Sequence, residues 1–315
     1  MGFKLYPLED TKRLDEICRL FSTGLGETMP EQWIWKHYTD NGLPKGMILV
    51  AENEIGKLGG MFAMQPAYYS CGNRRILLVQ TEDLVIDSEC RRQGLMRKMY
   101  DYAIEYYAKK EANALISLST NEASYPIFIK YGAKNLGNMT LYESKKTIIP
   151  KGWIKRIYKT NDWSISVSDD IPEQLFFSKT TDVWKMEKNQ RFMEWKFKDN
   201  PEQKYSWLKI EYKNELVGYM VFYVNRGRLR SAVNVCDWDL KNCVDEKILR
   251  RVVLILQSYG NWVSIWGSMS GTEERLWKAA GLGIEVKTQS HFVYHAIDKE
   301  SIFNKWHITK ADSDN

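Results

Sequence analysis

Apolar residues recur with two different periods along the first half of this chain. Spacings of three and four residues predict helices, whereas alternation or short continuous apolar runs predict strands. The predicted helices cover residues 11–22, 31–38, 92–109 and 122–130, and the predicted strands cover 47–52, 58–69, 75–86, 114–118 and 139–143. Strands and helices that alternate in this way favour an α/β fold with a central sheet covered by helices.

The segment 80–96 is the most informative part of this pattern. An apolar strand that carries Glu82 and Asp83 leads through a polar turn into a helix, and the turn reads Arg91-Arg92-Gln93-Gly94. The first N–H groups of a helix have no partner inside the helix, so they bind anions. Gly94 lets a phosphate approach the backbone, and the two arginines add positive charge. We therefore expect a pyrophosphate site here, although neither G-x-G-x-x-G nor Gly-Lys-Ser/Thr is present.

The second half of the chain repeats features of the first in the same order. The recurring features are Trp35-Lys36 and Trp195-Lys196, the strand pairs 47–52/58–64 and 206–212/216–224, and Phe128 and Trp277, each four residues before a glycine. Ordered correspondences of this kind predict a duplication, with one domain over 1–147 and another over 148–315. The second copy reads Asp237-Trp238-Asp239-Leu240 and then a helix over 245–257, without the glycine or the arginine pair. We expect no phosphate site there.

Composition adds limits to this picture. At 315 residues, two domains are the default. No apolar run approaches the roughly 20 residues that span a bilayer, and the N-terminus lacks the apolar core of a signal peptide, so we expect a cytoplasmic protein without membrane insertion. The five cysteines are scattered and the four histidines do not cluster with them. We therefore expect neither a disulfide framework nor a metal site.

Charge and aromatic content bear on the partner. The net charge of +5 is mild, and basic residues occur only in short pairs, which argues against nucleic acid. It is compatible with an anionic small ligand such as coenzyme A or a nucleotide-sugar. Twelve tryptophans and eighteen tyrosines indicate either a large aromatic core or a cleft with stacking surfaces for a sugar or base.

Three motifs resemble a known family. Arg91-x-x-Gly94 after a strand resembles motif A of the GNAT acyl-CoA N-acetyltransferases, with Met96 where Gly or Ala is usual. Residues 117–132 resemble motif B of that family, and Trp33-x-Trp35-Lys36 is similar to a bacterial GNAT subgroup. Many members of the subgroup lie in surface-polysaccharide gene clusters, and some carry a second, degenerate GNAT-like domain. The resemblance implies tandem GNAT-like domains, each a mixed central sheet flanked by helices.

The resemblance also implies a place for acetyl-CoA as co-substrate. It would lie in a V-shaped gap where the strand that ends at Ile86 splays from the strand 114–118. Backbone groups of residues 84–86 would pair with the pantetheine arm, and the amides of residues 92–96 would bind the pyrophosphate. The residues implied for CoA are Leu84, Val85, Ile86, Arg91, Arg92, Gln93, Gly94, Leu95, Met96, Asn121, Ser124 and Phe128.

Attack of a neutral amine on a thioester needs a base, an oxyanion donor and an acid for the thiolate. Glu82 is the preferred base because it alternates with Leu84 and Ile86 on one strand face, whereas Asp83 should point the other way. Asp83 is a second catalytic candidate on the same strand. The alternatives are a solvated edge charge for Glu82, and a cap or ion pair for Asp83. Many family members place a tyrosine acid where this chain has Phe128. Tyr125 is then the preferred acid, with Tyr131, water or simple packing roles as alternatives.

These motifs together predict an acetyl-CoA-dependent N-acetyltransferase that acts on a small amine. Within that class we expect a UDP- or dTDP-linked amino sugar of surface-glycan biosynthesis as acceptor. One alternative is a tandem-GNAT aminoacyl transferase that uses aminoacyl-tRNA, against which the intact Arg91-x-x-Gly94 turn and the weak basicity count. Another is a non-catalytic CoA-binding module, for which Phe128 is the main support.

Overall fold

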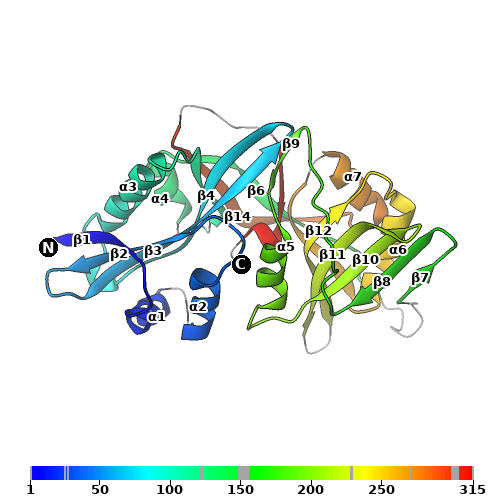
Figure 1. The fold of residues 1–315 in the computed structure, drawn as a ribbon, viewed down its shortest axis with the longest axis horizontal. Coiled ribbons are helices and arrows are strands. Elements are labelled where there is room, and N and C mark those ends of the chain that lie inside the picture. Colours follow the sequence, from blue (N-terminus) through cyan, green and yellow to red (C-terminus); the bar gives the residue numbers. More distant parts are fainter. Residues whose placement is uncertain are drawn as a thin grey trace. The chain divides into compact units, whose positions relative to one another are not determined.

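A computed structural model describes residues 2–24, 26, 28–120, 122, 124–147, 156–227, 230–269, 271–298 and 305–313. The chain divides into two compact units. Unit 1 comprises Met1–Tyr69, Arg75–Gly137 and His291–Phe303, and unit 2 comprises Ser70–Arg74, Asn138–Ser290 and Asn304–Asn315. In each unit helices pack against a sheet of parallel and antiparallel strands, which confirms the expected α/β fold class (Figure 1).

Unit 1 is built on the strand order β1-β2-β3-β4-β5, completed by the end of β14. The elements are β1 (Phe3–Leu8), α1 (Leu14–Ser22), α2 (Pro30–Tyr38), β2 (Met47–Asn53), β3 (Leu58–Cys71), β4 (Arg74–Ile86), the 3-10 turn η1 (Ser88–Cys90), α3 (Leu95–Ala108), β5 (Ala114–Thr120), α4 (Tyr125–Lys130) and β14 (Ile284–Ala296). The β1/β2 and β2/β3 pairs are antiparallel, whereas β4 and β5 are parallel. Parallel neighbours need a crossover connection, and α3 supplies it.

Two clusters of buried side chains hold this sheet between its helices. Leu95 and Met99 of α3 pack on one face, and Trp33 of α2 packs in the cluster of the other. β4 serves both clusters, because Leu84 and Ile86 contact the α3 cluster while Val85 lies in the α2 cluster. This is the two-residue alternation expected of a strand covered on both faces. β4 is therefore fixed from both sides at the end that leads into the turn.

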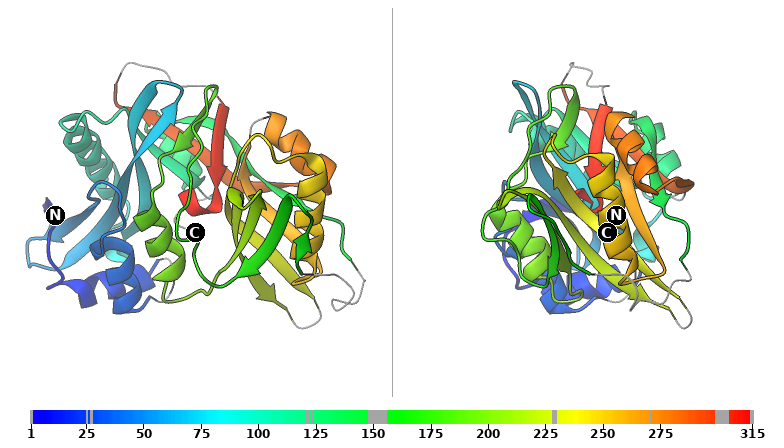
Figure 2. Two further views of the ribbon diagram at one scale, coloured as in Figure 1. Left: turned by 45° about the vertical axis from the view of Figure 1, so that its right-hand side comes forward. Right: turned by 90° about the vertical axis from the view of Figure 1, so that its right-hand side faces the viewer.

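Unit 2 has the strand order β6-β13-β12-β11-β10-β8-β7, and β15 pairs with both β13 and β9. Its elements are β6 (Lys134–Glu143), β7 (Tyr158–Lys159), β8 (Trp163–Ser168), β9 (Val183–Met186), α5 (Gln190–Met193), the π-helical η3 (Glu194–Lys198), β10 (Ser206–Tyr212), β11 (Glu215–Arg226), β12 (Ser231–Leu240), α6 (Glu246–Gln257), β13 (Trp262–Ser268), α7 (Gly271–Ala280), β15 (Lys305–Thr309) and the 3-10 turn η4 (Lys310–Asp312). α6 and α7 pack side by side against this sheet, with Trp277 and Trp238 in the shared core (Figure 2).

Each unit completes its sheet with a strand from the other half of the sequence. Residues 140–143 of β6 pair with β13 in unit 2, and residues 291–296 of β14 pair with β5 in unit 1. The predicted hairpins 47–52/58–64 and 206–212/216–224 are present as β2/β3 and β10/β11. In unit 1 the parallel pair β4/β5 follows the hairpin, and in unit 2 the parallel pair β12/β13 does so.

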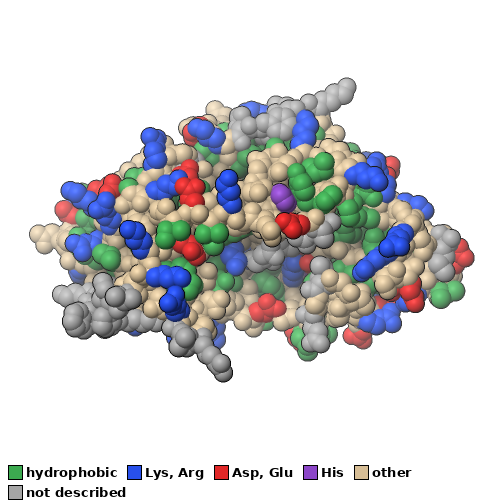
Figure 3. Space-filling model, turned by 180° about the vertical axis from the view of Figure 1, so that it is seen from behind, with side chains coloured by type: hydrophobic (Ala, Val, Ile, Leu, Met, Phe, Trp, Pro, Cys, Tyr) green, Lys and Arg blue, Asp and Glu red, His purple; other side chains and the backbone are tan. Residues whose placement is uncertain are grey.

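Two further features are the distribution of charged side chains on the surface and the length and polarity of the helices. Among the described residues of the face in Figure 3, basic side chains are scattered between acidic and hydrophobic ones and form no continuous stripe. Within the described part of the chain, every helix is too short or too polar to cross a bilayer.

Candidate functional site

The strands β4 and β5 of unit 1 separate part of the way along their length. Their parallel pairing runs from Leu78/Ala114 to Gln80/Ile116, and β4 then continues to Ile86 while β5 continues to Thr120. At the point of separation the Thr81 hydroxyl donates a hydrogen bond to the Ile116 carbonyl, 3.1 Å away. On its other edge β5 pairs with β14, from Ala114/Ala296 to Thr120/His291. Among the described residues no ladder pair joins residues 81–86 to β5, so the two strands no longer pair with each other there.

The turn after β4 leads into α3 through two residues with left-handed backbones. Arg92 has φ 61° and Gly94, the N-cap of α3, has φ 73°. The N-cap Gly94 has no side chain with which to cap the first amides of α3, and a Cβ built on it would meet nothing within 4 Å. A non-glycine residue held in this region is strained, and such strain concentrates at ligand sites. Open helix amides beside a turn of this kind form an anion-binding concavity.

The helix begins at Leu95 and not at Arg92, where the apolar period placed its start. The left-handed conformations of Arg92 and Gly94 explain the difference, because neither can continue a right-handed helix. Two side chains brace the turn. Arg91 Nε donates to the Ile86 carbonyl at 3.0 Å, and Gln93 Nε2 donates to the Glu89 carbonyl at 3.0 Å. The exposed backbone and the exposed Arg91 and Arg92 side chains therefore sit on a rigid loop.

The corresponding strands of unit 2 separate as well, but the chain itself occupies that position. β12 and β13 pair from Ala232/Trp262 to Val235/Ile265, and β15 then pairs with the end of β13. The Thr309 hydroxyl of β15 donates to Asp237 of β12 at 2.7 Å. A Cβ on Gly267 would collide with the Ile308 carbonyl oxygen, so only glycine admits this close strand. The gap that is open between β4 and β5 is thus filled between β12 and β13.

The helix that follows β12 also differs from α3. Its N-cap is Asp245, whose carboxylate accepts a hydrogen bond from the Ile248 amide at 3.0 Å. A carboxylate at a helix N-terminus satisfies the free amides and repels a second anion. Unit 2 therefore offers no open helix N-terminus for a pyrophosphate at α6.

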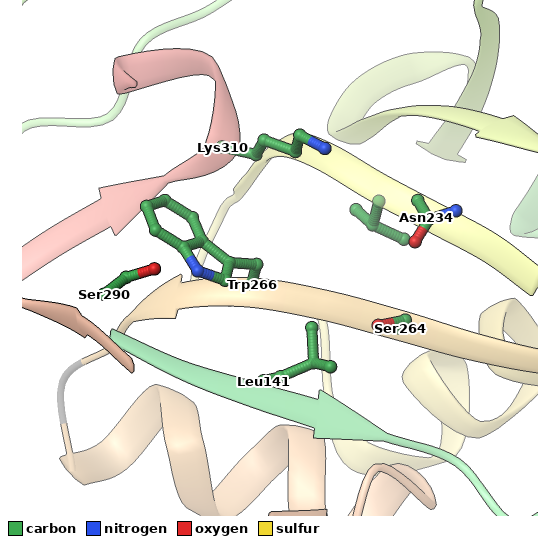
Figure 4. Close-up of a pocket in the computed structure, with 7 residues that line it drawn as sticks. Leu141, Asn234, Ser264, Trp266, Ser290 and Lys310 are labelled. Carbon is green, nitrogen blue, oxygen red and sulfur yellow. The ribbon is translucent and has the colours of Figure 1, made fainter. Parts of the chain in front are cut away.

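One hollow of unit 2 lies on β12, β13 and β6 (Figure 4). Its volume is 180 Å³, and its lining residues are Leu141, Asn234, Val235, Ser264, Trp266, Ser290 and Lys310. Sites for small molecules and cofactors usually enclose about 300–1,000 Å³. The hollow is therefore small for a coenzyme.

The two acidic residues of β4 converge on α2. Asp83 accepts from Lys36 Nζ at 2.8 Å and lies 3.2 Å from His37 Nε2. Glu82 places a carboxylate oxygen 3.8 Å from His37 Nδ1 and 4.0 Å from Lys36 Nζ. The expectation that Asp83 points away from Glu82 is wrong at the level of the carboxylates. Strand alternation fixes the direction of each Cβ and leaves the position of a charged group two or three bonds further out undetermined.

Asp83 is an ion-paired carboxylate. Burial alone would raise its pKa, but the adjacent Lys36 ammonium and the hydrogen bond from His37 outweigh burial and lower the pKa to about 2. Such a carboxylate stays ionised at neutral pH and is a weak proton acceptor, which fits the alternative that assigned Asp83 to an ion pair. Glu82, with its side chain 11% exposed, keeps contact with solvent.

The motif B residues lie on α4 and next to it. Phe128 is buried in the α3 cluster, 5.6 Å from the Tyr100 ring, so it packs as a core residue. The Tyr125 ring stacks on His291 with centroids 3.9 Å apart, and its hydroxyl accepts from Asn135. The Ser124 carbonyl accepts from the Ile127 and Phe128 amides at the start of α4. Asn121, expected at the pantetheine, lies outside the described residues.

His37 is a residue of the group around Glu82 and Asp83 that the sequence pattern did not indicate. It precedes Glu82 by 45 residues, and nothing in the linear pattern joins the two. The local signal available was the i, i+4 spacing of Trp33 and His37 on one helix, where the rings lie 4.2 Å apart. His37, Glu82 and Asp83 place one possible metal-ligand atom each within 4.8 Å of one another. The Lys36 ammonium already supplies a cation to both carboxylates, so we interpret the group as an ion-pair network.

Comparisons with known proteins agree with this geometry. Residues 8–135 match the family model of an acetyltransferase (GNAT) domain, a region that includes β4, the turn and α3. No curated protein matches the chain in sequence.

Solved structures extend the likeness to the whole chain. A conserved protein from Enterococcus faecalis V583 described as a probable N-acyltransferase has a TM-score of 0.68 at 9% identity, covering 95% of this chain and 73% of that one. A GCN5-related N-acetyltransferase from Anabaena variabilis ATCC 29413 has a TM-score of 0.67 at 14% identity, covering 94% and 73%. A tandem GNAT protein from the clavulanic acid biosynthesis pathway has a TM-score of 0.53 at 10% identity, covering 95% and 100%. At these identities the likeness establishes the fold.

Proposed function

We propose that this protein is a cytoplasmic, acetyl-CoA-dependent N-acetyltransferase with one acyl-CoA site, located in unit 1. The observation that carries the proposal is the open end of β4 followed by the uncapped, left-handed entry into α3. Unit 2 supports the same view by contrast, because β15 fills its strand gap and Asp245 caps its helix. We assign the second domain a supporting role in the substrate site or in stability.

The residues present fit coenzyme A at three points. The backbone of Leu84, Val85 and Ile86 would pair with the pantetheine amides, since that edge of β4 has no ladder partner in β5 among the described residues. The amides from Arg92 to Met96 would hold the pyrophosphate, and Arg91 and Arg92 add charge at the surface. Leu95 is buried in the α3 cluster, so it anchors the helix start beneath these amides. Ser124, Phe128 and Asn121 would border the arm, as the resemblance implies.

The bound co-substrate would supply an activated acetyl thioester. Glu82 would receive a proton from the substrate ammonium, which frees the nitrogen lone pair for attack. An amide N–H at the end of β4 would stabilise the developing oxyanion. Tyr125 is our candidate acid for the thiolate, and little assistance is needed because a thiol pKa is only about 8 to 9.

For the acceptor we propose a nucleotide-linked amino sugar, with UDP or dTDP as carrier, in surface-glycan biosynthesis. The mild positive charge, the abundant tryptophan and tyrosine, and the resemblance of Trp33-x-Trp35-Lys36 support this choice. Trp33 itself is buried between Phe21 and His37, so it belongs to the core and is not a stacking platform.

Two measurements test the proposal. Calorimetric titration of the full chain with acetyl-CoA should give one binding site per chain. Free thiol release, followed with a panel of UDP- and dTDP-amino sugars and simple amines, should show turnover with at least one amino sugar. Turnover only with other amines would refute the acceptor, binding without any turnover would indicate a CoA-binding module, and no binding would refute the acyl-CoA site. An aminoacyl transferase that uses tRNA should likewise ignore acetyl-CoA.

A further inference from the structure

His37 lies between the two acidic residues of β4. Its Nε2 atom is 3.2 Å from an Asp83 oxygen, and its Nδ1 atom is 3.8 Å from a Glu82 oxygen. The ring thus connects Asp83, an ion-paired carboxylate that is a weak base, to the carboxylate of Glu82. Neither contact was expected from the sequence, because α2 and β4 are far apart along the chain.

The ring is held in a fixed position. Its side chain is 7% exposed, and the Trp33 indole packs on it with a centroid distance of 4.2 Å. Phe21 of α1 packs in turn on Trp33, at 5.4 Å. Asp83 is ionised and is itself fixed by Lys36, so it orients the ring with Nε2 as the donor. An imidazole held in one tautomer by a buried carboxylate presents its other nitrogen as the proton acceptor.

We propose that His37 is a proton-relay and positioning residue that accepts the substrate proton from Glu82 during acetyl transfer. This inference rests on the proposed function and adds to it the route by which the proton leaves the site. The geometry points to Nδ1 as the accepting atom, because that is the nitrogen facing Glu82.

The proton balance is simple. An N–H bond of the substrate ammonium breaks and an O–H bond forms on Glu82. That O–H bond then breaks and an N–H bond forms at Nδ1 of His37, which returns Glu82 to the carboxylate. Asp83 stays ionised and compensates the imidazolium charge, and the proton leaves to solvent after product release. The second transfer needs the 3.8 Å separation to shorten to hydrogen-bond length, by a side-chain rotation or through one water.

The surrounding charges are compatible with this role. Lys36 faces both carboxylates from α2, and Tyr107 of α3 lies within electrostatic range of Glu82. Burial raises the Tyr107 pKa, so that phenol stays neutral at working pH. Two carboxylates, one ammonium and one imidazole lie within a few ångströms of one another, so they act as a coupled group.

His37→Gln is the sharpest test, since the glutamine amide can still donate to Asp83 but cannot carry the proton. The matched control is His295→Gln, which changes a half-buried histidine of unit 1 that packs beside Tyr100 and has Arg97 and Asp101 as its neighbouring charges. Each variant is assayed for acetyl transfer to the amine of the panel that wild type turns over fastest, across pH 5.5 to 9. Acetyl-CoA affinity and thermal unfolding are measured in parallel.

We expect kcat to fall about 10- to 100-fold in H37Q, with acetyl-CoA Kd and amine KM within about threefold of wild type. The ascending limb of the pH profile should move by about half a pH unit or more, whereas H295Q should keep both kcat and that limb. A wild-type pH profile with little loss of kcat in H37Q would overturn the relay.

Asp83→Asn provides a second variant if H37Q fails to fold. It keeps the ring but removes its anionic partner, and it should lower kcat and move the same limb; an unchanged profile would contradict the relay. Failure of the inference is distinguishable from failure of the proposed function. In the first case wild type transfers acetyl and the variants behave like it, and in the second wild type itself shows no transfer.

Discussion

Replacing Gly94 with leucine should remove coenzyme binding while leaving the fold in place. Gly94 has φ 73°, and a Cβ there would meet nothing within 4 Å. The new side chain therefore collides with no part of the protein, although its left-handed backbone costs about 1–2 kcal/mol of stability. It would instead occupy the open space beside the first amides of α3, where we place the pyrophosphate.

The expected magnitude follows from the bonds that are lost. A hydrogen bond to a charged group contributes about 1.5–3 kcal/mol. If the leucine keeps the pyrophosphate from two amides, acetyl-CoA binding weakens by about 3 kcal/mol or more, which is roughly a hundredfold rise in Kd. Calorimetry with acetyl-CoA measures this change, and urea unfolding measures the stability of the same sample.

Gly56 offers a matched control. It lies in the β2/β3 turn with φ 80°, and a Cβ there also meets nothing within 4 Å. Gly56→Leu should therefore lose the same 1–2 kcal/mol or so of stability and keep acetyl-CoA affinity within about twofold. An acetyl-CoA Kd for Gly94→Leu within threefold of wild type, in a folded protein, would refute the assignment of the pyrophosphate to α3.

Three further changes test the ion pairs and the acid. Asp83 has a folded pKa of about 2 against an ordinary 3.8, so it contributes about 2 kcal/mol of stability above pH 4 that is lost as the pH falls toward 2. Urea unfolding at several pH values should therefore show that Asp83→Asn loses less stability than wild type between pH 4 and pH 2. Equal losses in the two proteins would contradict this role of Asp83. Lys188→Met leaves Asp237 and Asp312 buried without their cation and should destabilise unit 2 by about 3–5 kcal/mol, whereas a change under about 1 kcal/mol would contradict the role of that pair. Tyr125→Phe keeps the ring stacked on His291 and should lower kcat about tenfold in the thiol-release assay with unchanged acetyl-CoA Kd, while an unchanged kcat would remove Tyr125 as the acid.

The turn between β4 and α3 could be predicted from sequence because its chemistry is local. The apolar strand, the polar turn and Gly94 lie within 20 residues, and each constrains the backbone by itself. α3 starts three residues later than apolar periodicity predicts. The reason is the left-handed conformation of Arg92, which periodicity does not reveal. Sequence patterns and structure are expected to disagree at functional turns, where a residue of ordinary helical propensity can be held in a non-helical conformation.

The long-range arrangement could not be predicted in the same way. The exchange of β6 and β14 depends on pairings between residues more than 100 positions apart, for which a single sequence carries no signal. The filling of the β12/β13 gap by β15 is also non-local, and only Gly267 hints at a close backbone approach. The contact of His37 with β4 depends on how α2 packs, so the network around Glu82 emerges only from the folded chain.

A crystal structure of the full chain with CoA would show whether unit 1 holds the one acyl-CoA site that we propose. We expect one CoA per chain, with its pyrophosphate oxygens within hydrogen-bond distance of the amides at the start of α3 and its pantetheine beside residues 84–86. A pyrophosphate bound at α6, or a pantetheine away from the end of β4, would contradict it.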